Sequence, residues 1–220
     1  MCARYSLTKE GLVITIGEIE IVIHVGARYN IAPRQKVPVI VAAGTGFSEV
    51  EMIWGWQPVW SKQFLINAKA ETLTEESTFK KYLHQRCLIP ADGFYEWTVG
   101  ADLKLPIRFT MPGDVGFCFA GFWYAVERQA GDLETADHHF VIITTAPNPT
   151  VAKINDRMPL IVQPKHYDWW LRQGQRFESV LKFPDQTELN FCPVQPELNK
   201  VGTEGPGLIR PYFSLQPGLI

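Results

Sequence analysis

Long hydrophobic runs, an excess of one sign of charge and paired cysteines are all missing from this sequence of 220 residues. The longest apolar stretches, such as 37–43, are much shorter than the roughly 20 residues that a membrane helix needs, and no signal-type segment opens the chain. We therefore expect no membrane contact and a cytoplasmic protein. The net charge of −2 excludes general polyanion binding through bulk charge, so any contact with nucleic acid requires a local basic patch.

The cysteines lack the spacing of metal ligands or of a disulfide framework. Cys87, Cys118 and Cys192 each stand alone in an apolar stretch without a C-x-x-C pair, which favours buried thiols. No His/Cys pair has ligand spacing, and no glycine-rich phosphate loop precedes a helical segment. The sequence thus predicts no metal and no cofactor.

Proline and glycine, 16 and 17 in number, separate short runs rich in valine, isoleucine and aromatic residues, as is typical of strands joined by turns. No repeat or linker interrupts this pattern, so residues 1–220 are expected to form one domain. The predicted fold class is α+β and β-rich, with a few short helices and with sheets curled into a partly closed barrel that removes exposed edges. The expected strands are 13–25 (a broken hairpin), 37–43, 86–90, 94–98, 107–111, 117–124, 140–145, 160–162 and 189–194, and the expected helices are 74–84 (capped by Thr74), 147–154 and 164–173.

Cys2 directly follows the initiator Met1, so removal of one residue makes a cysteine the N-terminus. Its α-amine and thiol, with ordinary pKa values of about 8 and about 8.5, are both partly deprotonated near neutrality. Such a pair captures aldehydes, because the amine condenses to an imine and the thiolate then closes a five-membered thiazolidine ring. Taken alone, Cys2 is equally consistent with an incidental residue at a frayed end.

Two segments combine aromatic and polar residues. The stretch 28–33 holds Asn30 and Pro33 and reads as a turn. Farther along, Trp54 precedes Asn67 and Lys69; aromatic faces stack on bases and a lysine can meet a phosphate, although a core tryptophan before a helix entry fits the same pattern.

A carboxylate flanked by aromatic residues marks the segment 86–97. In a strand, Glu96 shares a face with Phe94 while Tyr95 and Trp97 share the other, so Glu96 points toward the side that Phe94 lines. Such a group is either a tuned acid/base or a partner of Arg86 or Arg108 in a buried bridge. In the segment 146–159, Arg157 offers a fork for phosphate, or forms an exposed loop pair with Asp156.

Together these segments resemble the SOS-response-associated peptidase (SRAP) family, whose members shield abasic sites in single-stranded DNA. The resemblance covers nearly the whole chain and rests on the ordered motifs Met1-Cys2, Tyr29-Asn30-Ile31-Ala32-Pro33, Trp54-Gly55, Asn67-Ala68-Lys69-Ala70-Glu71-Thr72, Arg86-Cys87-Leu88-Ile89-Pro90-Ala91, Gly93-Phe94-Tyr95-Glu96-Trp97, Phe119-Ala120-Gly121 and Asp156-Arg157-Met158-Pro159.

The resemblance implies that the chain removes its own Met1 as an autocatalytic cysteine peptidase, after which Cys2 forms a thiazolidine with the opened sugar of an abasic site. By motif match, Asn67 orients that sugar or the Cys2 backbone, and Glu96 moves protons at the amine and the aldehyde oxygen. The implied DNA-binding set is Arg4, Asn30, Pro33, Trp54, Lys69, Arg86, Trp97 and Arg157. A monomer acting on damaged DNA at the nucleoid, if the chain is bacterial, is the expected setting.

The chain departs from the family at Asn155, where a histidine usually precedes Asp-Arg-Met-Pro, and at Ala3 and Lys69, where glycine and arginine are usual. Asparagine cannot shuttle a proton as histidine does. We therefore expect cross-linking to persist but more slowly, and strand cleavage and cross-link reversal to be impaired, unless His138, His139 or His166 substitutes in space. Lysine in place of arginine exchanges a fork for a point charge.

Three other functions remain compatible with the sequence. A cysteine-nucleophile hydrolase would use Cys2 and Glu96 on peptides and ignore abasic DNA. A single-strand binding module would rely on Trp54, Lys69 and Arg157 and be indifferent to Cys2. A degenerate family member would have lost activity with its histidine.

Overall fold

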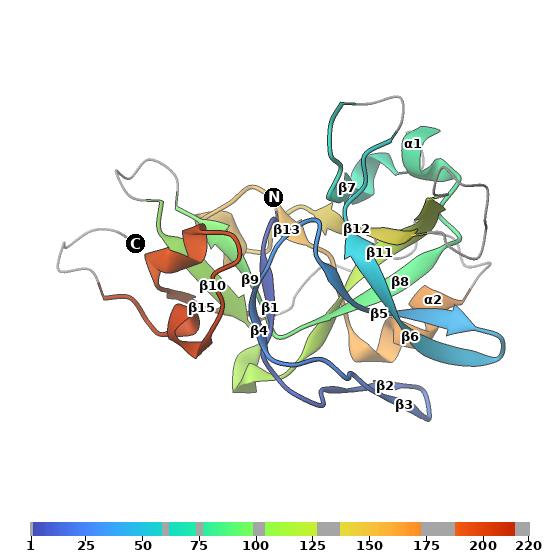
Figure 1. Ribbon diagram of the computed structural model, residues 1–220, viewed down its shortest axis with the longest axis horizontal. Coiled ribbons are helices and arrows are strands. Elements are labelled where there is room, and N and C mark those ends of the chain that lie inside the picture. Colours follow the sequence, from blue (N-terminus) through green and yellow to red (C-terminus); the bar gives the residue numbers. More distant parts are fainter. Residues whose placement is uncertain are drawn as a thin grey trace.

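The computed structural model describes residues 2–58, 62–73, 77–98, 104–126, 137–172 and 188–213. Strands dominate it, and helices are few and short (Figure 1). The strands are β1 (Tyr5–Leu7), β2 (Val13–Ile16), β3 (Ile19–Val22), β4 (Arg28–Ile31), β5 (Lys36–Ala43), β6 (Gly46–Trp54), β7 (Asn67–Lys69), β8 (Arg86–Ala91), β9 (Gly93–Trp97), β10 (Pro106–Thr110), β11 (Phe117–Val126), β12 (Asp137–Thr145), β13 (Met158–Pro159), β14 (Ile161–Val162) and β15 (Asn190–Pro193). The helices are α1 (Ser77–Lys80) and α2 (Tyr167–Leu171), and the 3-10 helices are Ala70–Thr72, Pro112–Asp114, Val151–Lys153, Pro164–His166, Pro196–Asn199 and Pro206–Ile209.

The larger sheet closes on itself. β12 pairs with β6, β6 with β5, β5 with β8, β8 with β11, and β11 again with β12, so these five strands form a ring. Gly121 in β11 permits the closure, because a Cβ there would lie 2.7 Å from the carbonyl oxygen of Val141 and 2.5 Å from Ile89. The barrel predicted from the strand-rich pattern is thus confirmed, and the closed ring leaves no free edges among its members.

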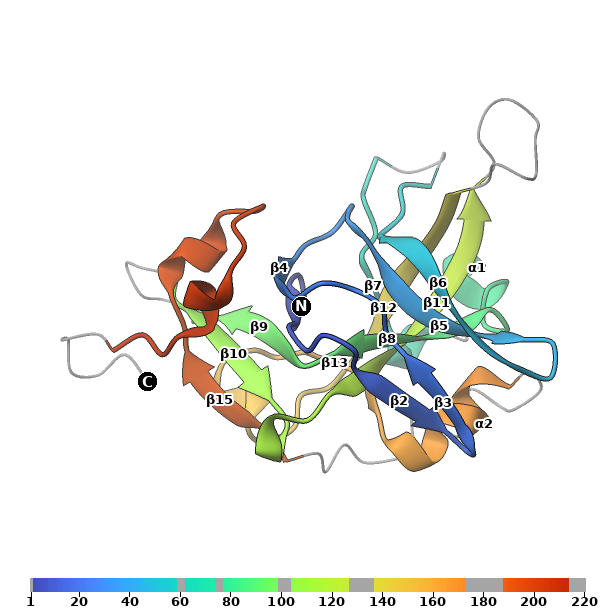
Figure 2. The same cartoon turned by 60° about the horizontal axis from the view of Figure 1, so that its bottom comes forward.

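A second sheet, in the order β15-β10-β9-β1-β4, lies beside the ring in both views (Figures 1 and 2). One apolar core joins the two sheets. Phe94 of β9 stacks on Phe109 of β10 with ring centroids 5.0 Å apart, and meets Phe119 of the ring edge-on at 6.2 Å. The burial of these rings fixes β9, and therefore the face on which Glu96 projects, against the barrel.

Several elements differ from the predicted ones. The stretch 28–31 is strand β4, not a turn, because it pairs with β1. Within 147–154 only Val151–Lys153 is helical, and the expected helix 74–84 is reduced to α1 in its described part, the Thr74 cap lying outside the described residues. No helix among the described residues is long and apolar enough to span a membrane.

Candidate functional site

Strand β1 delivers the N-terminal segment to the junction between the two sheets. Tyr5 pairs with Phe94 and with Ile31, so β1 lies between β9 and β4. The backbone N–H of Tyr95 donates to the carbonyl of Arg4 at 3.1 Å, which carries the alignment one step farther toward Cys2 and Glu96. Cys2 therefore lies beside β9, with 0% of its surface exposed.

The buried environment of Cys2 controls its thiol. Burial, reinforced by the negative charge of Glu96, raises the pKa of the Cys2 thiol well above its ordinary value. The sulfur makes a long contact of 3.8 Å to the carbonyl oxygen of Arg4. The thiol is thus protonated near neutrality in this state, and a base must take its proton before the sulfur can attack.

Asn67 holds the backbone of Cys2. Its Nδ2 donates to the Cys2 carbonyl oxygen at 2.8 Å, which is one of the two contacts, sugar or Cys2 backbone, that the resemblance implies. The parallel pairing of β7 with β12, Asn67 opposite Ile142, fixes this position. Asn67 Oδ1 is buried and has no hydrogen-bond partner among the described residues, so it can accept a donor brought by a ligand.

Glu96 is the acid/base candidate. The predicted alternation is confirmed, because Phe94 packs in the main core whereas Tyr95 and Trp97 pack in a separate cluster. Only 2% of Glu96 is exposed, and its burial raises the carboxyl pKa to about 7. The Asn155 amide donates to Glu96 Oε2 at 2.8 Å and opposes that rise. A carboxyl poised near neutrality can both accept and return protons.

Asn155 occupies a fixed orientation. Its Oδ1 accepts the backbone N–H of Arg157 at 3.1 Å, so its Nδ2 must face Glu96. An amide in this place donates a hydrogen bond and transfers no proton. His138 and His139 lie toward the other end of β12 from the residues that pair with β7, stacked near Trp123 and Tyr124, and His166 packs near Trp169.

The predicted phosphate cations differ in availability. Lys69 is exposed on the same face of β7 as Asn67. Arg157 forms a two-pronged ion pair with Glu71, at 2.8 and 2.9 Å, and also donates to the carbonyl of Thr144 at 2.6 Å. Arg4 donates to Asn30 at 2.7 Å and to the carbonyl of Leu198 at 3.0 Å.

Two of the residues predicted to contact DNA have buried side chains. Trp54 is 0% exposed, donates to the carbonyl of Ile66 and stacks on Phe140, so it packs the core and offers no face to a base. Arg86 is 6% exposed; its guanidinium lies over the Trp170 ring and donates to the carbonyl of Leu83. Trp54 is buried among the aromatic side chains of the core, whereas Arg86 is covered by α2.

Of the three remaining predicted contacts, Asn30 and Trp97 lie against the segment 196–203 and Pro33 does not. Asn30 is fully buried and donates to the carbonyls of Leu198, Lys200 and Thr203 at 3.1–3.2 Å. Trp97 is partly buried, and its Nε1 donates to Asn199 at 2.6 Å. Pro33 is partly exposed in the turn that leads into β5. Asn30 and Trp97 thus hold the segment 196–203 against the smaller sheet.

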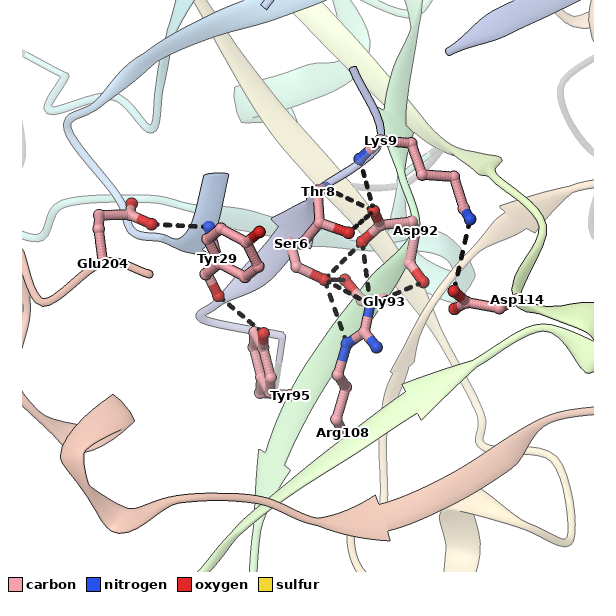
Figure 3. A network of polar contacts seen from close by, with 10 residues as sticks. All are labelled: Ser6, Thr8, Lys9, Tyr29, Asp92, Gly93, Tyr95, Arg108, Asp114 and Glu204. Atoms are coloured by element: carbon pink, nitrogen blue, oxygen red, sulfur yellow. Dashed lines mark hydrogen bonds and ion pairs between the residues drawn. The ribbon is translucent and has the colours of Figure 1, made fainter. Parts of the chain in front are cut away.

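A polar network that the sequence did not reveal anchors β1 (Figure 3). Asp92 is fully buried and accepts from Ser6 at 2.7 Å, from the Thr8 hydroxyl at 2.6 Å and from Arg108 at 3.1 Å. Arg108 is therefore the partner of Asp92. The sequence does show Asp92 as a charged residue in the apolar segment 86–97, between two strands. Its partners are not evident there, because they are brought together only by the pairing of β1, β9 and β10.

Solved structures share this architecture. A crystal structure of a protein from Bacteroides thetaiotaomicron superposes with a TM-score of 0.78 at 20% identity, covering 96% of this chain and 100% of that one. A phage-related protein from Bordetella bronchiseptica superposes with a TM-score of 0.70 at 25% identity, covering 88% and 94%. The fold is therefore one that natural proteins already use.

Sequence comparison identifies the family. The chain is 33% identical over 196 residues to the abasic site processing protein YoqW of Bacillus subtilis, covering 84% of this chain and 86% of that protein. It is 29% identical over 191 residues to the abasic site processing protein YedK of Escherichia coli, covering 84% of each. The profile of the SOS response associated peptidase family matches residues 1–201. The chain belongs to the SOS response associated peptidase (SRAP) family.

Proposed function

We propose that this protein captures abasic sites in single-stranded DNA through a covalent bond to Cys2. The observation that carries the proposal is the convergence of Cys2, Asn67 and Glu96: an amide donor on the Cys2 carbonyl and a carboxyl of pKa about 7 whose charge acts on the Cys2 thiol. The names of the relatives, abasic site processing proteins, support the same substrate. The setting we propose is a monomer at damaged DNA in the cytoplasm.

The chemistry has two stages. Hydrolysis of the peptide bond between Met1 and Cys2 consumes one water and releases methionine, leaving the α-amine of Cys2 free. That amine attacks the aldehyde carbon of the ring-opened sugar, and loss of one water gives an imine. The thiol then adds its sulfur to the imine carbon and its proton passes to the nitrogen, which closes the thiazolidine ring without an oxidant or reductant.

Glu96 and Asn67 serve these steps in different ways. As a carboxylate, Glu96 accepts a proton from the Cys2 ammonium, which frees the amine to attack, or from the thiol; as an acid it returns a proton to the departing hydroxyl. Its pKa of about 7 makes both forms available near neutrality. Asn67 holds the Cys2 backbone still, so that the nucleophiles meet the aldehyde in one orientation.

Asn155 limits the reactions of the cross-link once it has formed. Strand cleavage by β-elimination and reversal of the cross-link both require a proton transfer at the sugar or the ring nitrogen, and the Asn155 amide offers only a hydrogen bond. We propose that the chain forms a stable cross-link and cleaves the strand weakly.

The test combines intact mass with a denaturing gel. The purified chain is incubated with single-stranded DNA that carries one abasic site, in parallel with the variant Cys2→Ala and with undamaged DNA. Loss of Met1 and a covalent adduct that requires both Cys2 and the abasic site are expected. A processed Cys2 terminus that gives no adduct contradicts the proposal and favours non-covalent binding; release of peptides with no effect on DNA favours a hydrolase.

A further inference from the structure

We propose that Arg34, supported by the ring of Phe64, binds a backbone phosphate of the single-stranded DNA beside the abasic site. This inference rests on the proposed function, because it adds a contact to the same DNA-binding surface. Arg34 stands outside the motifs that identify the family.

The two side chains form a supported cation. The guanidinium carbon of Arg34 lies 4.0 Å from the centroid of the Phe64 ring. Arg34 is exposed, and its guanidinium makes no hydrogen bond or ion pair with any of the described residues. A cation over an aromatic ring loses side-chain freedom while its N–H groups stay available. The arrangement suits a guanidinium whose ligand comes from outside the protein.

The platform beneath Arg34 is built into the fold. Phe64 packs directly against Gly55, since a Cβ at Gly55 would lie 2.4 Å from the Phe64 ring. Gly55 also has φ +95°, a conformation that side chains rarely adopt, and its N–H donates to the carbonyl of Phe140 at 2.8 Å. Glycine at position 55 thus admits the ring, and the ring in turn supports Arg34.

The platform lies close to the reacting end of the chain. Phe64 precedes Asn67 by three residues, a span of at most about 10 Å of extended backbone, and Asn67 binds the Cys2 carbonyl. A bridge to Trp56 holds Leu65, the residue that follows Phe64. From the other side, the backbone N–H of Arg34 donates to the carbonyl of Trp54 at 2.8 Å. A strand whose abasic sugar reaches Cys2 therefore has its neighbouring phosphates within reach of this site.

Backbone strain is a second, independent observation. Arg34 has φ +74°, in the left-handed region, within a turn closed by a 3.3 Å bond from Gln35 N–H to the Ala32 carbonyl. With Pro33 before it, this is the place in a type II turn where glycine is preferred. An arginine retained where glycine is less strained points to a use for its side chain.

Arg34 also differs from the cations that the motifs singled out. The guanidinium groups of Arg4 and Arg157 already bond to Asn30 and Glu71 within the protein. Arg34 offers a planar fork that can take two phosphate oxygens at once without first breaking such a contact. Its role is therefore to bind the strand, and the chemistry at Cys2 does not depend on it.

The experiment measures non-covalent binding to undamaged DNA, so that cross-linking at Cys2 does not contribute to the measured affinity. The parent chain and its variants are titrated against a fluorescent, undamaged single-stranded oligonucleotide at several salt concentrations. Arg34→Gln should weaken binding and reduce the slope of log affinity against log salt by about 0.7, the value for one phosphate contact on a single strand. Arg34→Lys should keep the slope while losing part of the affinity, and Phe64→Leu should weaken binding with the charge retained. Lys36→Gln is the matched control, because Lys36 is an exposed cation two residues away that already pairs with Glu51.

The stability of Arg34→Gly distinguishes a DNA-binding role for Arg34 from a structural one. Arg34→Gly relieves the strained backbone and should raise the melting temperature while weakening DNA binding; a loss of stability with unchanged binding would overturn the inference. If the parent chain binds the oligonucleotide and Arg34→Gln binds as well as Lys36→Gln, the inference about Arg34 is overturned and the proposed function is not. Failure of the parent chain to bind single-stranded DNA would overturn the proposed function as well.

Discussion

Asn155 donates its side-chain amide to Glu96 at 2.8 Å, and its own oxygen is occupied by the backbone N–H of Arg157. The amide cannot turn without losing one of these bonds, so Glu96 faces a fixed donor that carries no transferable proton. Glu96 is thereby left as the ionisable member of this pair, and in the proposed function its carboxyl, of pKa about 7, handles protons there without an imidazole.

Replacing Asn155 by histidine should therefore restore proton transfer. Asn155→His is expected to accelerate strand cleavage at an abasic site by about tenfold or more, since a placed general acid/base contributes about 10²–10⁴-fold. The measurement is the rate of strand breakage on a denaturing gel under single-turnover conditions. Asn190→His, on the exposed residue of β15, is the control. If Asn155→His cleaves no faster than the parent, Asn155 does not limit turnover.

Removing the donor on the Cys2 carbonyl should slow cross-linking. In the parent, Asn67 Nδ2 donates to the Cys2 carbonyl oxygen at 2.8 Å. In Asn67→Asp a carboxylate oxygen replaces this donor and faces the carbonyl oxygen instead. The cross-linking rate should fall by about tenfold or more, because losing a buried hydrogen bond and leaving two acceptors opposed costs about 1–3 kcal/mol. Asn190→Asp gives the same charge change on the surface. Equal rates for the two variants would remove Asn67 from the site.

The raised pKa of Glu96 makes stability depend on pH in a stated direction. Because the folded pKa of about 7 lies above the ordinary value, the folded state holds the proton more tightly, and stability falls as the pH rises from about 4.5 to about 7. The loss from this group is roughly 3 kcal/mol. Glu96→Gln should remove it, so that thermal unfolding changes less between pH 5 and pH 8 than in the parent.

Glu51→Gln, at an exposed carboxylate paired with Lys36, is the control for this measurement. It should follow the parent at both pH values. The same pH dependence in Glu96→Gln and in the parent would show that another group carries it.

Glu71 should compete with DNA for Arg157. Glu71 accepts from both terminal nitrogens of the guanidinium, and one of these also donates to the carbonyl of Thr144, so a phosphate meets a complete fork only when Glu71 withdraws. Glu71→Gln removes the charge that pairs with Arg157, so the competition with phosphate becomes weaker. The affinity for undamaged single-stranded DNA should rise severalfold at low salt and by a smaller factor at high salt. Glu51→Gln removes an equal charge elsewhere. Weaker binding by Glu71→Gln would instead show that Glu71 positions Arg157 for the strand.

The elements predicted correctly from the sequence are those whose residues specify them locally. β5 and β11 are runs rich in β-branched or aromatic residues, and β8 is a mostly apolar run that begins with Arg86; all three strands belong to the barrel. β1, β4 and β7 are three or four residues long and partly polar, and they exist as strands because of the partners that they meet. β6 was missed because Glu49 and Glu51 interrupt its apolar pattern on the outer face.

The residues of the site also differ in whether local sequence or distant contacts determine their positions. The direction of Glu96 follows from strand alternation, so the sequence predicts it. The burial of Trp54 in the core and of Arg86 beneath α2 depends on contacts with distant segments, which no local pattern contains. The engagement of Arg157 by Glu71 and the pairing of Asp92 with Arg108 depend likewise on contacts between segments far apart in the chain.

The Asp92 network should determine both stability and the placement of Cys2. Asp92 is a fully buried carboxylate that accepts hydrogen bonds from Ser6 within β1 and from Thr8 directly after it, and it pairs with Arg108 at 3.1 Å. Asp92→Asn leaves the Arg108 guanidinium, on a side chain that is 11% exposed, without its counter-charge. This costs about 3 kcal/mol or more and lowers the melting temperature by about 6 °C or more in a chain of this size.

The matched variant is Asp114→Asn, in the neighbouring pair with Lys9, where the side chains are 36% and 60% exposed. It should change the free energy of unfolding by less than about 0.5 kcal/mol, because an exposed ion pair contributes little. At a temperature where all the proteins are folded, Asp92→Asn should also cross-link abasic DNA more slowly, since β1 leads directly to Cys2. Reduced stability with an unchanged cross-linking rate would mean that Asn67 alone holds Cys2 in place.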